Sequence, residues 1–351
     1  FAPPFPDETV QIAWFYKPPT DGDLAVLAAN FDVFVLTHKD EAARDTLRAM
    51  GVTAPILQYF TLDSIQDPGS CSAEPYGNQV AYEAGDFCAI REQHPDWFLL
   101  DANGQPLVHD DDYMMDPGNS GWRAFFLERV KQSQDRWGWN GVFLDNVEAS
   151  LAKRLRRGAM PAAYPDDVSY QGAIKAFLKY LYDGYFQPNG RPLFANIIDL
   201  EDQGVWFQYL QDLDGAMEES FAVDWSDGYR GEAEWEEQTS RVEQTQKLGK
   251  RVILVAQGSR DDTQRELFAF ASYLLVTDGA ASFRYADSDK YGEVWLHSNY
   301  PIDLGEPLGP RYRDGAVWRR DFKGGSVSVD PAFHTASIIV PGPTSSPSPQ
   351  P

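Results

Sequence analysis

The sequence has few of the residues and motifs on which metal and nucleotide sites depend. Its 351 residues include two cysteines and five histidines, and the histidines are scattered at positions 38, 94, 109, 297 and 334. No Gly-x-Gly-x-x-Gly turn follows the first apolar run, and no Gly-x-Ser-x-Gly elbow occurs. These absences argue against a dinucleotide-binding fold, a serine-hydrolase triad and a metal centre. We therefore expect no cofactor and no metal.

Long apolar runs are also missing, and basic residues are in the minority. No stretch approaches the ~20 consecutive apolar residues that a membrane-spanning helix needs. The chain has 30 Lys and Arg against 53 Asp and Glu, which gives a formal net charge of −23. Such a surface repels polyphosphate, which excludes nucleic acids and anionic membranes as expected partners. Solubility explains this charge, and a cationic substrate is the alternative explanation.

The two cysteines lie close together in a polar segment. Cys71 and Cys88 enclose 16 residues rich in Gly, Pro and Asn. We predict a disulfide, worth about 3 kcal/mol through loop closure, and two unpaired thiols are the alternative. A disulfide implies an oxidising compartment. The first ten residues lack a basic segment and an initiator Met, which is typical of a processed end. Together with the disulfide this predicts a secreted protein, and we also expect a monomer.

Short apolar runs alternate with segments of helical periodicity. The eight runs are Val10–Tyr16, Phe31–Thr37, Pro55–Phe60, Gly141–Asn146, Leu193–Ile198, Gly215–Phe221, Val252–Gln257 and Ala281–Tyr285. The helical segments are Asp40–Met50, Gly121–Trp137, Tyr170–Phe186, Glu232–Leu248 and Thr263–Thr277. This alternation predicts parallel βα units, and eight of them fit a closed (β/α)8 barrel, with an open doubly wound sheet as the alternative.

The pattern also predicts how the chain is divided. We expect residues 1–290 to form the barrel, residues 291–340 a small β extension packed on it, and residues 341–351 a Pro/Ser-rich tail. An insertion at 61–140 separates the third and fourth strands and carries the cysteines. Within it we predict a strand at Trp97–Leu100. Long loops at the strand ends of a barrel commonly build the substrate cleft.

The strongest local signal is the end of the fourth predicted strand. The apolar run 141–146 leads directly into Asp145, and Phe143 shares its face because strand side chains alternate. Barrel enzymes place catalytic groups at this end of a strand. Asn146 and Glu148 crowd the same turn, which favours function over the alternative role of a helix N-cap.

The sixth predicted strand also ends in carboxylates, at Glu218 and Glu219. If Met217 lies in the core, Glu219 points into the barrel with it and Glu218 points outward. The alternative is that both are surface or capping groups. We expect Asp145 and Glu219 to face each other across the barrel mouth.

Two carboxylates on either side of one bond are what glycoside hydrolysis needs. Mutual repulsion and burial raise the pKa of one of them. Glu219 is the predicted acid, because Met217, Phe221 and Trp225 give it an apolar setting. Asp145 is the predicted nucleophile or base. The separation that decides between retention and inversion is not fixed by the sequence.

Other strand ends carry polar and aromatic residues that suit a sugar, since ring faces stack on pyranoses and amides bind hydroxyls. The predicted substrate-binding residues are Trp14, Tyr16, Lys17, Gln58, Tyr59, Asp116, Asn146, Glu148, Asn196, Glu218, Gln257, Arg284 and Tyr285. Asp116 has a second interpretation, which is to hold the loop before a helix capped by Ser120.

Four segments together resemble a known group of enzymes. They are G-V-F-L-D-N at 141–146, D-P-G-N-S-G-W-R at 116–123, F-A-N-I at 194–197 and D-G-A-M-E-E-S-F at 214–221. They resemble bacterial barrel glycoside hydrolases similar to endo-α-1,4-polygalactosaminidases and spherulin-4-type glycosidases. The resemblance covers roughly residues 10–330 in element order. It implies that the strand-four Asp, here Asp145, and the strand-six Glu, here Glu219, are the catalytic pair.

These observations predict a secreted glycoside hydrolase that acts on a polysaccharide or oligosaccharide with two carboxylates. A carbohydrate-binding barrel without catalytic activity is the alternative. A metal-dependent barrel hydrolase is a third possibility, and it would need a cluster of His and Asp that the sequence does not display.

Overall fold

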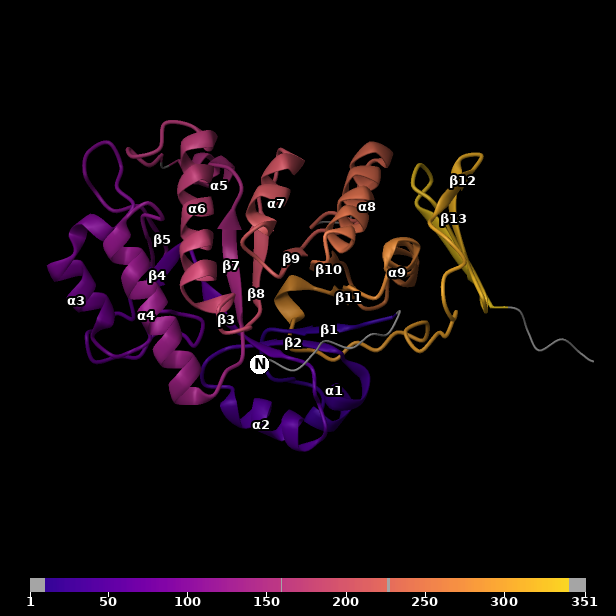
Figure 1. The fold of residues 1–351 in the computed structure, drawn as a ribbon, viewed down its shortest axis with the longest axis horizontal. Coiled ribbons are helices and arrows are strands. Elements are labelled where there is room, and N and C mark those ends of the chain that lie inside the picture. Colours follow the sequence, from indigo (N-terminus) through magenta and orange to yellow (C-terminus); the bar gives the residue numbers. More distant parts are fainter. Residues whose placement is uncertain (1–9, 159, 226–227, 341–351) are drawn as a thin grey trace, which may run out of the picture.

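The computed structural model describes residues 10–158, 160–225 and 228–340, so the predicted processed start and the Pro/Ser-rich tail lie outside the described residues (Figure 1). Eight parallel strands follow one another in the order β1-β2-β3-β7-β8-β9-β10-β11. They are β1 Ala13–Phe15, β2 Val33–Leu36, β3 Ile56–Thr61, β7 Val142–Glu148, β8 Leu193–Ile198, β9 Gly215–Glu218, β10 Arg251–Gln257 and β11 Ala281–Ala286. A parallel bridge between Ile12 and Phe283 joins the first and last strands. The predicted (β/α)8 barrel is confirmed.

Both faces of the barrel sheet are buried, which explains why its strands read as continuous apolar runs. One face fills the lumen, where Phe143, Phe194 and Met217 pack together. The opposite face packs under the surrounding helices, and Val142 and Leu144 of β7 belong to that outer core. Alternate residues of one strand therefore enter two different cores.

Helices cover the outside of the barrel. They are α1 Leu24–Asn30, α2 Glu41–Ala49, α4 Ser120–Trp137, α6 Asp167–Leu181, α7 Gln203–Leu210, α8 Glu232–Lys247 and α9 Thr263–Val276, with the short α5 Ala152–Arg156 after β7. The helix predicted at Tyr170–Phe186 ends earlier than expected, because Tyr182–Phe186 forms a separate π-helical turn, η2. The pattern missed the short helices α1 and α7. After β11 the described residues continue through the 3₁₀ turn η3, Ser288–Lys290, without a barrel helix.

The N-terminus of α4 corrects one prediction. The cap is Asn119 rather than Ser120, because the Asn119 side chain accepts hydrogen bonds from the backbone N–H of Gly121 at 2.9 Å and of Trp122 at 3.1 Å. Asn and Ser cap helices about equally well, so the residue types alone do not decide between adjacent positions.

The insertion forms a small layer beside the barrel. It contains β4 Ser64–Gln66, α3 Asp86–Gln93, the 3₁₀ turn η1 Pro95–Trp97, β5 Val108–His109 and β6 Asp112–Met114, with the strands in the order β4-β6-β5. The predicted strand at Trp97–Leu100 is wrong. Pro95 begins a helical turn there, as its fixed φ favours, and only single bridges follow at Phe98 and Leu100.

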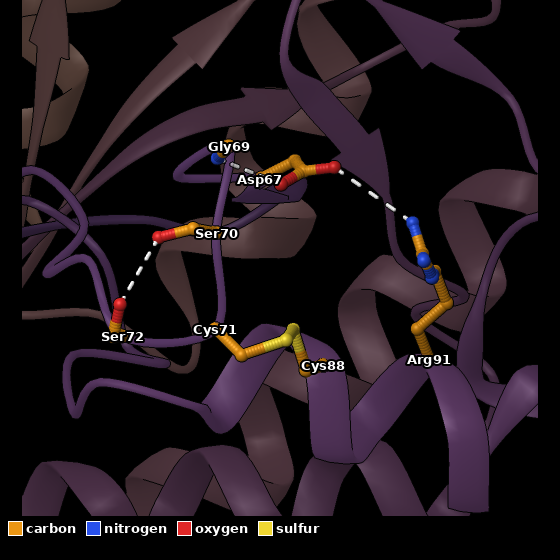
Figure 2. The surroundings of a disulfide bond; sticks show 7 residues. All are labelled: Asp67, Gly69, Ser70, Cys71, Ser72, Cys88 and Arg91. Atoms are coloured by element: carbon orange, nitrogen blue, oxygen red, sulfur yellow. Dashed lines mark hydrogen bonds and ion pairs between the residues drawn. A yellow bond between two sulfur atoms is a disulfide. The ribbon is translucent and has the colours of Figure 1, made fainter.

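A disulfide joins the exposed loop of the insertion to α3, as predicted. Cys71 and Cys88 are bonded with their Cα atoms 5.7 Å apart. Figure 2 shows a second link between the same two segments, an ion pair of 3.8 Å between Asp67 and Arg91. The loop is therefore fastened to α3 at two points. None of the described helices has the length and apolar character needed to cross a membrane.

An antiparallel sheet follows the barrel. Its strands are β12 Tyr312–Asp314, β13 Val317–Phe322, β14 Gly325–Asp330 and β15 Thr335–Ile339. Figure 1 shows this sheet beside α8 and α9, at the end of the molecule opposite α3. Val327 and Val329 are buried, and the Arg320 guanidinium donates to the Thr277 carbonyl at the end of α9, at 2.6 Å. The sheet thus extends the core over these two helices.

Candidate active site

A β-bulge shapes the end of β7. Leu144 pairs with Ala195 and Val147 with Ile197, so two β7 residues, Asp145 and Asn146, lie opposite one residue of β8. Asn146 has a positive φ of 56°, which asparagine tolerates better than most residues. Bulges commonly redirect side chains beside active sites. Here the bulge lies directly opposite Asn196 of β8.

The Asn196 amide joins the two predicted catalytic carboxylates. Its Nδ2 donates to Asp145 Oδ1 at 2.9 Å and to Glu219 Oε2 at 2.6 Å, and the side chain is 3% exposed. The two residues do not face each other across the barrel mouth. They lie on β7 and directly after β9, with only β8 between them. Because one nitrogen bonds an oxygen of each carboxylate, these two oxygens are at most about 5.5 Å apart, which is close to the carboxyl separation of ~5–5.5 Å in retaining glycosidases.

The two adjacent glutamates lie on opposite faces. Met217 fills the barrel lumen, and Glu219 points the same way. Glu218 instead forms an ion pair with Arg241 of α8. Only Glu219 therefore approaches Asp145.

Glu219 has an environment that favours its protonated form. Burial and the nearby Asp145 carboxylate raise the pKa of Glu219 to about 7, although hydrogen bonds from Asn196 and Tyr291 oppose the shift. The expected contribution of Trp225 to an apolar setting is wrong, because that side chain is 53% exposed. Burial by the barrel itself supplies the desolvation.

Tyrosines surround the Asp145 side of the site. Tyr59 Oη donates to Asp145 Oδ2, and burial together with Asp145 raises the pKa of Tyr59 well above its ordinary value. Tyr16 stacks on Tyr59 with ring centroids 5.2 Å apart, and Lys17 Nζ lies 5.2 Å from the Tyr16 ring. These predicted residues lie together at the barrel mouth.

Three other predicted substrate-binding residues point away from the mouth. Trp14 is fully buried outside the lumen, Gln58 donates to Ser133 of α4 at 2.5 Å, and Tyr285 bonds the backbone after β10. Each of the three follows or precedes a residue whose side chain points into the lumen. Because side chains alternate along a strand, their own side chains point outward to the helices. We correct these predictions to structural roles.

Glu148 is also not part of the mouth. Its carboxylate is fully buried, and it receives hydrogen bonds from Arg154 at 2.6 Å and from Tyr170 at 2.9 Å. Lys153 lies 3.5 Å away, and Asp63 shares both cations. A carboxylate so fully paired inside the protein has no access to substrate, so this prediction is corrected as well.

Asp116 and Arg284 hold the scaffold. Asp116 accepts hydrogen bonds from Tyr164 Oη and from the Gly118 N–H, the loop-holding role stated as its alternative. Arg284 points into the lumen beneath the site, and burial lowers its pKa to about 10. It donates to the Phe15 carbonyl at 3.1 Å. Neither side chain is exposed to the cavity described below.

The sequence pattern missed Tyr291. Its Oη donates to Glu219 Oε1 at 3.0 Å, and Gln257 Nε2 donates to the same Oη at 2.5 Å. Gln257 was predicted from its position at the end of β10. Tyr291 lies in the loop after η3, outside any apolar run. Its only sequence signal was its place after the last barrel strand, at the face where barrels build their sites.

A cavity of about 790 Å³ opens beside Glu219 and the Asn196 amide that bonds Asp145. Its lining includes Glu219, Asn196, Asn146 and Glu218, together with the exposed ring of Trp225. This size lies in the range of small-molecule sites. Among the described residues, no group of three or more His, Cys, Asp or Glu has a geometry that could hold a metal ion.

Comparisons with known proteins bear on the family and the fold of the chain. A family model described as hypothetical glycosyl hydrolase family 15 matches residues 55–326. The glycoside hydrolase domain of PelA from Pseudomonas aeruginosa superposes with a TM-score of 0.54 and 15% identity, covering 82% of this chain and 97% of that chain.

Two amylases share the same fold. A maltogenic α-amylase, AmyB, from Thermotoga neapolitana and an α-amylase from Malbranchea cinnamomea each match at a TM-score of 0.53 and 10% identity. They cover 92% of this chain and 86% and 85% of their own. At these identities the structural likeness shows the barrel fold alone. No curated protein sequence matches the chain.

Proposed function

The chain belongs to hypothetical glycosyl hydrolase family 15 and is a glycoside hydrolase, and from this premise we propose that Asp145 and Glu219 are its catalytic pair. The observation that carries the proposal is the Asn196 amide, which holds both carboxylates at 2.9 and 2.6 Å. Two carboxylates at this spacing can reach the same glycosidic bond. The substrate is then a polysaccharide or oligosaccharide.

The roles of the two carboxylates follow from their surroundings. With its pKa at about 7, Glu219 carries a proton that it can transfer to the leaving glycosidic oxygen. Asp145 accepts hydrogen bonds from Tyr59 and Asn196, which suits an ionised carboxylate that attacks the anomeric carbon. The C–O bond to the leaving group breaks as the bond to Asp145 forms.

The second step restores the enzyme. Glu219, now ionised, takes a proton from water, and the water oxygen displaces Asp145 from the anomeric carbon. The product keeps its anomeric configuration because two inversions cancel. This retaining course is favoured by the short separation, since inverting enzymes need about 6.5–9.5 Å to admit a water.

Several features of the cavity support a sugar ligand. Of the ten tryptophans, all of which lie in the described residues, only Trp225 is exposed, and its ring can stack on a pyranose. The lining also contains charged residues of both signs. They are Asp199, Glu201, Glu218, Glu219, Glu234 and Glu237, and Lys153, Arg156, Arg157, Arg230 and Arg241. Because six acids nearly balance five bases, charge alone does not select a cationic sugar.

A reducing-end release assay tests the activity. The panel starts with galactosamine polymers, because of the resemblance to polygalactosaminidases, and adds neutral α- and β-linked glucans and galactans. We expect the wild type to release reducing ends from one of them and Asp145→Asn to lose at least ~10³-fold of that rate. If Asp145→Asn retains the rate, the catalytic assignment is wrong.

Direct binding measurements address the alternative. A wild type that binds a panel member without cleaving it would support a carbohydrate-binding barrel instead. Product NMR that reports the inverted anomer would contradict the retaining course. We also infer that the protein is secreted, because the bond between Cys71 and Cys88 persists in oxidising compartments.

A further inference from the structure

The Tyr291 hydroxyl lies against the proposed acid and points its proton at it. The distance from Oη to Glu219 Oε1 is 3.0 Å, and the tyrosine is 7% exposed. Gln257 Nε2 donates to the same hydroxyl oxygen at 2.5 Å. Since Gln257 occupies the oxygen as a donor, the hydroxyl proton is directed to the carboxylate.

Tyr291 is fixed from several sides, although it lies in a loop. Arg284 Nη2 donates to the Tyr291 carbonyl at 2.6 Å, and the same guanidinium bonds the Phe15 carbonyl at 3.1 Å. The Tyr291 ring meets the Phe15 ring edge-on, with centroids 4.8 Å apart. Arg284 thus ties the end of β1 to this loop and sets where the hydroxyl points.

We propose that Tyr291 is a positioning residue, whose hydroxyl holds Glu219 in place and stabilises its ionised form. This inference rests on the proposed function, in which Glu219 donates a proton in one step and recovers one in the next. Such a group works best when neither form is strongly favoured. Burial and Asp145 favour the protonated form, and the Tyr291 hydrogen bond opposes them.

Other charged and polar groups lie close enough to Glu219 to influence its titration. They are Asp145 on β7, Tyr59 on β3, Glu218 with its partner Arg241, and Tyr291 with Arg284 beneath it, and the neutral amides are Asn196 and Gln257. Asp145 and Glu218 raise the Glu219 pKa, whereas Asn196 and Tyr291 lower it. Of the two side chains that hydrogen-bond the Glu219 carboxylate, Asn196 and Tyr291, only the contribution of Tyr291 can be removed by deleting a single oxygen.

The variant Tyr291→Phe makes that deletion and keeps the ring. We expect the upper limb of the kcat/KM pH profile to move up by about one pH unit, the scale of one lost hydrogen bond to a charged group. We also expect kcat at the optimum to fall several-fold. The matched control is Tyr185→Phe. Tyr185 is also 7% exposed, but its hydroxyl has no hydrogen-bond partner among the described residues, so the profile should not move.

A measurement independent of turnover separates the two proposals. In protein labelled with ¹³C at Glu carboxyls, the signal missing from Glu219→Gln identifies Glu219, and its titration should move to higher pH in Tyr291→Phe. An unmoved or lowered titration, or a rate loss equal at every pH, overturns the role of Tyr291. A wild type without hydrolytic activity overturns the proposed function, while the carboxyl titration still decides this inference.

Discussion

Two buried glutamates, Glu148 at the end of β7 and Glu219 just after β9, have opposite electrostatic surroundings. Burial raises the pKa of both carboxyls. Glu148 bonds Arg154 at 2.6 Å, with Lys153 at 3.5 Å. Glu219 has instead a second carboxylate as its neighbour, and its partners Asn196 and Tyr291 are neutral. Cations oppose the shift at Glu148, whereas Glu219, with its pKa at about 7, keeps a proton that it can transfer.

The difference shows that a strand-end position and burial do not identify a catalytic carboxylate. Both glutamates end apolar runs of the same barrel, and both were expected at the site. What distinguishes them is the partner, because a cation in contact stabilises the ionised form. Arg154 reaches Glu148 from α5, the short helix that follows β7, and no cation contacts Glu219 in the described residues.

The largest expected effect is on catalysis at Glu219. Glu219→Gln should lower turnover by ~10²–10⁴-fold, the scale of losing a general acid. The loss should be smaller for aryl glycosides with good leaving groups, which need little protonation. Steady-state kinetics on both substrate types measure this. An equal loss on both would mean that Glu219 does not act as the acid.

The next effect is on stability at Glu148. Arg154→Met leaves Glu148 without its main cation and Asp63 without one of its two cationic partners, and it should cost about 3–5 kcal/mol in the free energy of unfolding. The control Lys179→Met breaks an exposed pair with Asp183 and should cost less than ~0.5 kcal/mol. Denaturant unfolding compares the two. If the two variants lost similar amounts of unfolding free energy, the buried ion pairs of Glu148 and Asp63 would not be stabilising.

The pH dependence of stability should also separate the two glutamates. The folded pKa of Glu219, about 7, lies above its ordinary value of 4.5, so its contribution to stability is full below pH 4.5 and is lost as pH rises through 7. Glu219→Gln cannot ionise, so its Tm relative to the wild type should be higher at pH 8 than at pH 5.

Glu266 provides a control for the pH dependence of the Tm. Burial also raises the pKa of Glu266 on α9 to about 7, and its carboxylate accepts hydrogen bonds from the neutral Asn299 amide. Glu266→Gln should therefore show the same pH trend while activity stays unchanged. A relative Tm of Glu219→Gln that is independent of pH would contradict the raised pKa.

The smallest effect is expected at Glu218, which resembles Glu148 in having an arginine partner. Glu218→Gln should reduce turnover by less than ~10-fold, because its carboxylate pairs with Arg241 rather than with Asp145. The steady-state kinetics described for Glu219→Gln also measure the turnover of this variant. An inactive Glu218→Gln beside a near-normal Glu219→Gln would reverse the roles of the adjacent glutamates.

The sequence by itself determined the barrel and which of the two adjacent glutamates points into it. Eight apolar runs separated by helical segments allow few other folds, because each strand must be covered on both faces. The alternation of side chains placed Glu219 with Met217 and Glu218 away from it. These are local properties of one strand, so the pattern of a few residues contains them.

Only the tertiary structure decided which strand-end residues form the site. Trp14, Gln58 and Tyr285 read like site residues, but both faces of these strands are buried, so polarity and aromaticity do not reveal which face is the lumen. The Asn196 bridge depends on a bulge in the neighbouring strand, and Tyr291 comes from a loop held by Arg284. Such contacts join distant segments, and no local pattern of residues records them.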